Sequence, residues 1–194
     1  MVQKIVDALV NKQSQKHVMT YEEEKIYRYG YVLLCEVILN LVIALAIGIV
    51  FSKTKAIMFF LGMYIPLRSF CGGWHADKIW KCTVISNVIL LLQVYGIENI
   101  INYLSIRWML VIFFLNMVCV FFIAPVETEM KKISQDEKQI YKGKIKFILA
   151  FHVIIVMITV LFDVNEFVFS MMFVYIIQNV MLLMEIVKKR KCYS

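Results

Sequence analysis

Six long apolar runs alternate with short polar stretches along this chain. The runs cover approximately residues 31–51, 54–70, 83–104, 106–125, 145–163 and 167–187. Each run is close to the roughly 17–25 residues with which a helix crosses the hydrocarbon core of a bilayer. Pro66 interrupts the second run and Glu98 lies near the end of the third, so either helix is open to being tilted, broken or re-entrant. The pattern predicts an all-α, polytopic integral membrane protein with about six transmembrane helices.

The N-terminal segment has a different pattern. Residues 2–10 place five apolar side chains on one face of a helix: Val2, Ile5, Val6, Leu9 and Val10. This spacing predicts an amphipathic helix that lies in the membrane interface, either docking a substrate or simply anchoring the chain to the surface. Further along, Thr20 and Glu23 form a capping-box pattern, so we expect a helix to begin there and to continue into the first apolar run.

Charge and composition support the same class of protein. Apolar residues make up 61% of the 194 positions, against about 45–50% in soluble domains. The net charge of +7 does not indicate nucleic-acid binding, because the basic residues follow the topology. With six crossings from an intracellular N-terminus, only Lys53, Lys55 and Arg107 of the 21 Lys and Arg lie outside. This asymmetry predicts cytoplasmic N- and C-termini and a cytoplasmic 75–82 segment, which would move outside if the second and third runs did not cross.

We expect one membrane domain over residues 1–194. It would comprise a cytoplasmic and interfacial segment at 1–29, a transmembrane bundle at 30–187 and a basic cytoplasmic tail at 188–194. The polar stretch 126–144 predicts one cytoplasmic loop. The chain carries no G-x-x-x-x-G-K-[ST] phosphate loop, and we expect no cofactor. Its five cysteines have no paired spacing, which favours reduced thiols over a disulfide framework.

The polar island between residues 66 and 82 carries the candidate chemistry. A cysteine attacks an amide carbonyl as a thiolate, and a neighbouring imidazole can take its proton and pass it to the departing amine. Cys82 and His75 are seven residues apart, about 10 Å along a straight helix, which is too far for a hydrogen bond. Gly72 and Gly73 favour a non-helical entry and a helix that starts near Ala76, so the chain can bend to bring the pair together.

Other interpretations stay open at this stage. A thiol in an apolar protein often serves only in packing. Cys71, His75, Asp77 and Cys82 offer four possible metal ligands, but their spacing matches no common zinc pattern, so we expect no metal.

Three ionisable residues inside the apolar runs are also candidates for function, because charge in a bilayer is costly: Glu36, Glu98 and His152.

The run Arg68-x-x-x-Gly72-Gly73-x-His75-Ala76, followed by Cys82, resembles the signature of the accessory gene regulator B (AgrB) family. Members of this family are membrane endopeptidases that mature cyclic peptide pheromones in Gram-positive quorum sensing. The stretches 25–30 and 124–131 agree with the same family. The length, the number of spans and the amphipathic N-terminus also fit, so the resemblance covers essentially the whole chain.

The resemblance implies a role for each motif residue. Cys82 would be the nucleophile and His75 its general base. Arg68, Gly72 and Gly73 are motif positions of supporting role. Arg68 can bind an acidic substrate segment or an oxyanion, or can act only as a positive-inside anchor. Asp77 is a candidate for orienting His75, although neighbours on a helix point apart.

The implied partners are a short amphipathic precursor peptide of the AgrD type and the lipid bilayer of a Gram-positive cell membrane. The enzyme would cut off an acidic C-terminal tail through an acyl-thioester and would support closure to a thiolactone or lactone. Self-association as a homodimer stays open. Two rival functions remain: a membrane exporter of the mature peptide, which would use Glu36, Glu98 and His152 along a pathway, and a noncatalytic scaffold.

Overall fold

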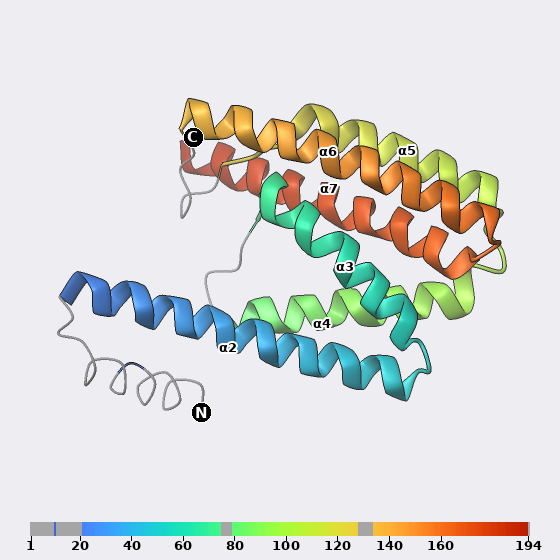
Figure 1. Ribbon diagram of the computed structural model, residues 1–194, viewed down its shortest axis with the longest axis horizontal. Helices are drawn as coiled ribbons and strands as arrows, with labels where there is room; N and C mark the ends of the chain where they lie inside the picture. Colours follow the sequence, from blue (N-terminus) through green and yellow to red (C-terminus); the bar gives the residue numbers. More distant parts are fainter. Residues whose placement is uncertain (1–9, 11–20, 75–78, 128–133, 194) are drawn as a thin grey trace.

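Helices account for nearly all of the chain that the computed structural model describes, which is residue 10 and residues 21–74, 79–127 and 134–193. The helices are α2 (Tyr21–Val50), α3 (Thr54–Cys71), α4 (Ile79–Tyr95), the π-helix η1 (Gly96–Ile100), α5 (Ile106–Ile123), α6 (Gln135–Leu161) and α7 (Asn165–Tyr193) (Figure 1). No strand occurs within the described ranges. The all-α prediction is therefore confirmed. The proposed interfacial helix at 2–10 lies outside the described residues except for Val10.

The helices form two groups that α3 joins. Helices α5, α6 and α7 lie side by side, and α2 and α4 form the second group, with α3 crossing between the groups (Figure 1). α7 packs against α3, α5 and α6, while α2 packs against both α3 and α4. Helix direction alternates along the chain, so the connections fall at two ends of the bundle. An ion pair of 2.5 Å from Lys53 Nζ to Glu166 Oε1 ties the α2–α3 and α6–α7 connections together at one end.

Within the part of the chain that the structure describes, four stretches are long and apolar enough to cross a membrane: Trp80–Ile100, Ile106–Ile123, Gln135–Leu161 and Asn165–Arg190. α3 is not among them, and in α2 the stretch Val37–Val50 is apolar but shorter. A polytopic membrane protein follows from these four. The second and third apolar runs, whose crossings were uncertain from the sequence, differ in structure. α3 continues through Pro66 as a helix, and the third run changes to π-helical turns at Gly96.

The prediction of one loop over 126–144 was wrong in its second half. α6 begins at Gln135, because Ser134 and Glu137 form a complete capping box. The Ser134 hydroxyl accepts from the Glu137 amide at 3.3 Å, and the Glu137 carboxylate accepts from the Ser134 amide at 2.9 Å. These bonds satisfy two backbone donors at the helix start. α6 therefore begins about ten residues, most of them polar, before its apolar run.

The core of the second half is centred on α7. Phe113 of α5 is fully buried, and its ring meets that of Tyr175 of α7 edge to face at 5.0 Å. The Tyr175 hydroxyl lies 3.0 Å from Nδ1 of His152 on α6. Three helices thus meet through one aromatic cluster. In an apolar solvent such contacts hold helices together by close packing and hydrogen bonding, since lipid is as apolar as the side chains.

We expect Phe113→Ala to destabilise the bundle, because it leaves a cavity at this junction, with a cost of about 3 kcal/mol for a Phe-to-Ala change in a core. Phe122→Ala on the same helix is the matched control, since that side chain is 78% exposed. The thermal unfolding midpoint of the purified protein in detergent should fall by several degrees for the first variant and stay within a degree for the second. Equal midpoints would contradict the packing described here.

Candidate active site

A short non-helical segment leads out of α3 toward α4. α3 ends at Cys71, and Gly72 and Gly73 follow with φ angles of 73° and 118°. A side chain is strained in this region of backbone space. A Cβ at Gly72 would also collide with the Val126 carbonyl oxygen, and one at Gly73 with Nη1 of Arg68. The predicted non-helical entry at the two glycines is therefore confirmed, and both positions require glycine.

Arg68 holds this segment in place. Its Nη1 donates to the Gly72 carbonyl at 2.6 Å, and its Nη2 donates to the Trp74 carbonyl. The planar guanidinium suits this task, because its donors form a rigid fork. Arg68 thus binds the chain's own backbone, a use that neither the substrate-binding nor the topological interpretation anticipated.

α7 and the chain after α5 provide further hydrogen bonds to the backbone of this segment. Gln178 of α7 donates through Nε2 to the Gly72 carbonyl at 3.1 Å. The Trp74 amide donates to the Met181 carbonyl at 2.9 Å, and the Val126 amide donates to the Cys71 carbonyl at 2.9 Å. The segment is therefore fixed against both α7 and the chain that follows α5, and residue 74 has a defined position.

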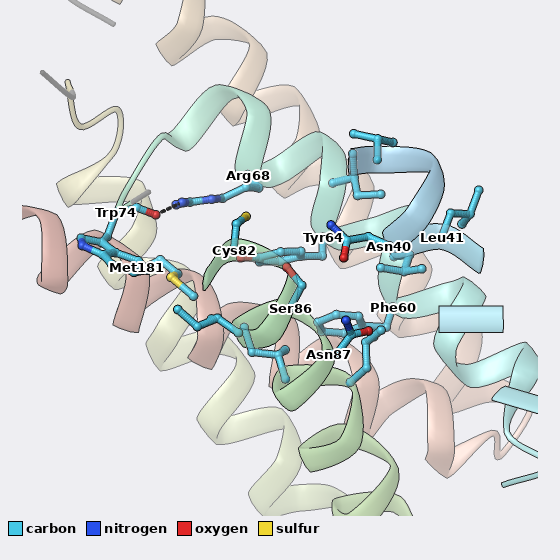
Figure 2. A pocket seen from close by; sticks show the side chains of 16 residues that line it. Asn40, Leu41, Phe60, Tyr64, Arg68, Trp74, Cys82, Ser86, Asn87 and Met181 are labelled. Carbon is cyan, nitrogen blue, oxygen red and sulfur yellow. Dashed lines mark hydrogen bonds between the residues drawn. The ribbon is translucent and has the colours of Figure 1, made fainter. Parts of the chain in front are cut away.

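A cavity of about 320 Å³ lies beside this segment, between α2, α3 and α4. Figure 2 shows Cys82, Arg68, Trp74 and Met181 grouped at one side of it, with Tyr64 next to Cys82. Cys82 lies in the first turn of α4, and its sulfur points toward the Arg68 side chain (Figure 2). The structure therefore brings together Arg68, the glycine-fixed segment and the thiol that the sequence singled out.

The two cysteines of the motif have different surroundings. Cys71 is completely buried in the core at the end of α3, whereas Cys82 is only partly buried and lines the cavity. Of these two thiols, only Cys82 borders the cavity. Cys71 packs within the core.

The other predicted catalytic group, His75, lies outside the described residues, as does Asp77. The pairing of His75 with Cys82 and the orienting role of Asp77 therefore stay predictions. Trp74, the residue before His75, lines the same cavity as Cys82.

Sequence reasoning missed three residues near this site. Tyr64 lines the cavity from α3. Gln178 donates to the Gly72 carbonyl, and Glu185 is 2% exposed on the same helix, near Arg68. Gln178 and Glu185 are seven residues apart, so they share one face of α7. The sequence signal for Gln178 and Glu185 was the presence of two polar residues on one face of an otherwise apolar helix, since such residues in a membrane helix often serve a function.

The ionisable candidates of the exporter hypothesis are scattered. His152 is buried and contacts Tyr175, which supplies the partner that the sequence could not name. Glu98 is exposed in η1. The surroundings of the Glu36 side chain lie outside the described part of the chain. His152 and Glu98 do not line the cavity beside Cys82.

The comparisons with known proteins point to one family. The model of the family described as "AgrB: Accessory gene regulator B" matches residues 2–186. An AgrB-like protein 2 of Clostridium perfringens (strain 13 / Type A) is 25% identical over 173 residues, which is 86% of this chain and 80% of that protein. An AgrB-like protein of Clostridium perfringens (strain SM101 / Type A) is 24% identical over 172 residues, covering 85% and 80%. No solved structure matches.

We expect Gly73→Ala to displace the 72–74 segment, because the added methyl group meets Arg68 and the Met181 backbone at a positive φ. Gly62→Ala is the control, since a Cβ there has nothing within 4 Å. The rate at which N-ethylmaleimide alkylates Cys82, followed by mass spectrometry of its peptide, should change several-fold in the first variant only. An unchanged rate in both would mean that the segment does not shape the surroundings of Cys82.

Proposed function

The chain belongs to the accessory gene regulator B family, which processes agr quorum-sensing peptides, and we propose that it is a membrane cysteine endopeptidase. Its substrate would be an AgrD-type precursor with an amphipathic leader and an acidic C-terminal tail. The observation that carries the proposal is the position of Cys82. This thiol lines a cavity next to Trp74, whose backbone is fixed by Arg68 and Met181 immediately before His75.

In the proposed first step, His75 removes the proton from Cys82, and the thiolate attacks the carbonyl carbon of the amide before the tail. The carbon–nitrogen bond then breaks while the protonated imidazole gives its proton to the departing nitrogen. The tail leaves as a free amine, and the rest of the peptide stays on Cys82 as a thioester.

In the second step, a cysteine or serine within the bound peptide attacks the thioester. The carbonyl moves to that side chain, a thiolactone or lactone ring closes, and Cys82 regains its proton. Exchange between two thioesters is nearly balanced, but replacing an amide by a thioester is unfavourable. Net formation of the ring therefore depends on removal of the tail or of the product.

The charge of the chain fits an acidic tail. Four basic residues close the C-terminal sequence at 188–191, and Lys78 and Lys81 flank the start of α4. A surface of this sign attracts an anionic peptide segment. We propose that this end of the bundle faces the cytoplasm of a Gram-positive cell, because that orientation places most Lys and Arg inside.

The exporter and scaffold alternatives have less support. Export along Glu98 and His152 needs a shared pathway, but one is exposed and the other is buried against Tyr175. A scaffold needs no thiol beside a cavity. The endopeptidase proposal is the one that uses the position of Cys82.

We expect Cys82→Ala and His75→Ala each to abolish release of the tail from a tagged precursor, because either change removes the reacting pair. Cys119→Ala is the control, since this thiol is exposed on α5. Co-expression with the precursor, followed by gel analysis of the tag, measures the result. Full tail release by Cys82→Ala would overturn the proposal. An exporter would still show cleaved peptide accumulating inside cells, and a scaffold would show no cleavage even with the unaltered chain.

The thioester should be detectable when the second step is blocked. We expect a precursor whose internal nucleophile is replaced by alanine to leave its acyl part on Cys82. Intact mass spectrometry should then show the protein heavier by the mass of the precursor minus the mass of the released tail. Neutral hydroxylamine should remove this adduct. Tail release without any adduct, even under rapid quenching, would favour direct hydrolysis instead.

A further inference from the structure

The cavity beside Cys82 is almost entirely apolar. Its walls include Val37 and Leu41 of α2, Phe60 of α3, and Ile85, Ile89 and Leu90 of α4. Arg68 is the one charged group among its described lining residues. Both of its Nη atoms donate hydrogen bonds to backbone carbonyls. The volume of about 320 Å³ is at the lower end of the range of about 300–1,000 Å³ for ligand sites. The cavity thus suits a short apolar ligand.

Two asparagines that line this apolar cavity have side-chain oxygens without a hydrogen-bond donor among the described residues. Asn40 of α2 and Asn87 of α4 both line it, and Figure 2 shows them on the side away from Trp74. The Oδ1 atoms of both are buried without a hydrogen-bond partner among the described residues. Asn87 Nδ2 donates to the Thr83 carbonyl at 2.8 Å, which fixes the orientation of that amide. Buried acceptors without partners are rare and costly, so a ligand that donates hydrogen bonds is indicated.

We propose that this cavity binds the residues on the N-terminal side of the scissile bond, with Asn40 and Asn87 accepting hydrogen bonds from peptide N–H groups and the walls selecting apolar side chains. This inference rests on the proposed function. The cavity holds the part of the substrate that becomes attached to Cys82, and it therefore sets which peptide the enzyme accepts.

The chemistry of the cavity distinguishes this occupant from two others. The acidic tail does not fit, because an apolar wall would desolvate its carboxylates and Arg68 already donates to the backbone. A lipid acyl chain would suit the walls, but it has no N–H group to satisfy two amide oxygens. A peptide with apolar side chains meets both requirements.

Protection of Cys82 from alkylation tests the proposal without needing cleavage. We expect N-acetyl-Leu-Phe-amide to slow the reaction of Cys82 with N-ethylmaleimide several-fold in the full-length protein, and N-acetyl-Asp-Asp-amide to have no effect. The analogue with methylated backbone nitrogens should need about tenfold more peptide for the same protection, because it lacks donors for the buried oxygens. In Asn40→Leu and Asn87→Leu, methylation should make less difference.

Several results would overturn the assignment. Absence of protection by the Leu-Phe peptide would show that the cavity does not bind it. Equal protection by the methylated peptide would show that any lipophile enters, as expected for a lipid site.

A matched pair of variants extends the test to the substrate. Leu90 is 3% exposed and lines the cavity, whereas Leu91 is 43% exposed and does not. We expect Leu90→Trp to abolish the protection and to lower kcat/KM for the precursor at least tenfold, and Leu91→Trp to change neither by more than twofold. Equal effects of the two would overturn the cavity assignment while tail release stands. If the unaltered protein released no tail, the proposed function would fail, but the protection result would still be decisive for the cavity.

Discussion

The need to satisfy every backbone polar group inside an apolar bundle governs this structure. Between α3 and α4 the chain leaves its helix, and its amides and carbonyls lose their regular partners. In lipid-like surroundings each unsatisfied group costs several kcal/mol. Arg68, Gln178 and the backbone of Met181 supply the missing partners. These bonds fix the segment from Gly72 to Trp74, and Trp74 lines the same cavity as Cys82.

The division of the chain into helices was predictable because apolar runs of membrane length leave few alternatives. The ends of the helices were harder to predict. The start of α6 depends on a capping box at Ser134 and Glu137 within a polar stretch that otherwise indicates a loop. Pro66 left open whether the second apolar run is tilted, broken or re-entrant, and the helix continues past it to Cys71. Local signals such as these decide boundaries, while apolar length decides only that a helix exists.

The site was only partly predictable from the sequence. The sequence identified the run from Arg68 to Cys82 as a candidate site, because it combines reactive residues and glycines in one polar island. The sequence did not identify Tyr64, Asn40 and Gln178, since each is a single polar residue in an apolar helix. Gln178 reaches Gly72 across 106 positions of sequence. No spacing rule links residues so far apart, and only the packing of α7 against α3 brings them together.

The guanidinium of Arg68 has a structural role that could be mistaken for a catalytic one. Both of its Nη atoms hold the protein's own carbonyl groups, so it stabilises a shape and has no need to touch a reacting atom. Under the proposed function, a mutational survey that scores only the finished peptide would nevertheless group Arg68 with Cys82 and His75. A signature motif therefore records residues that hold the backbone in place as well as residues proposed to react.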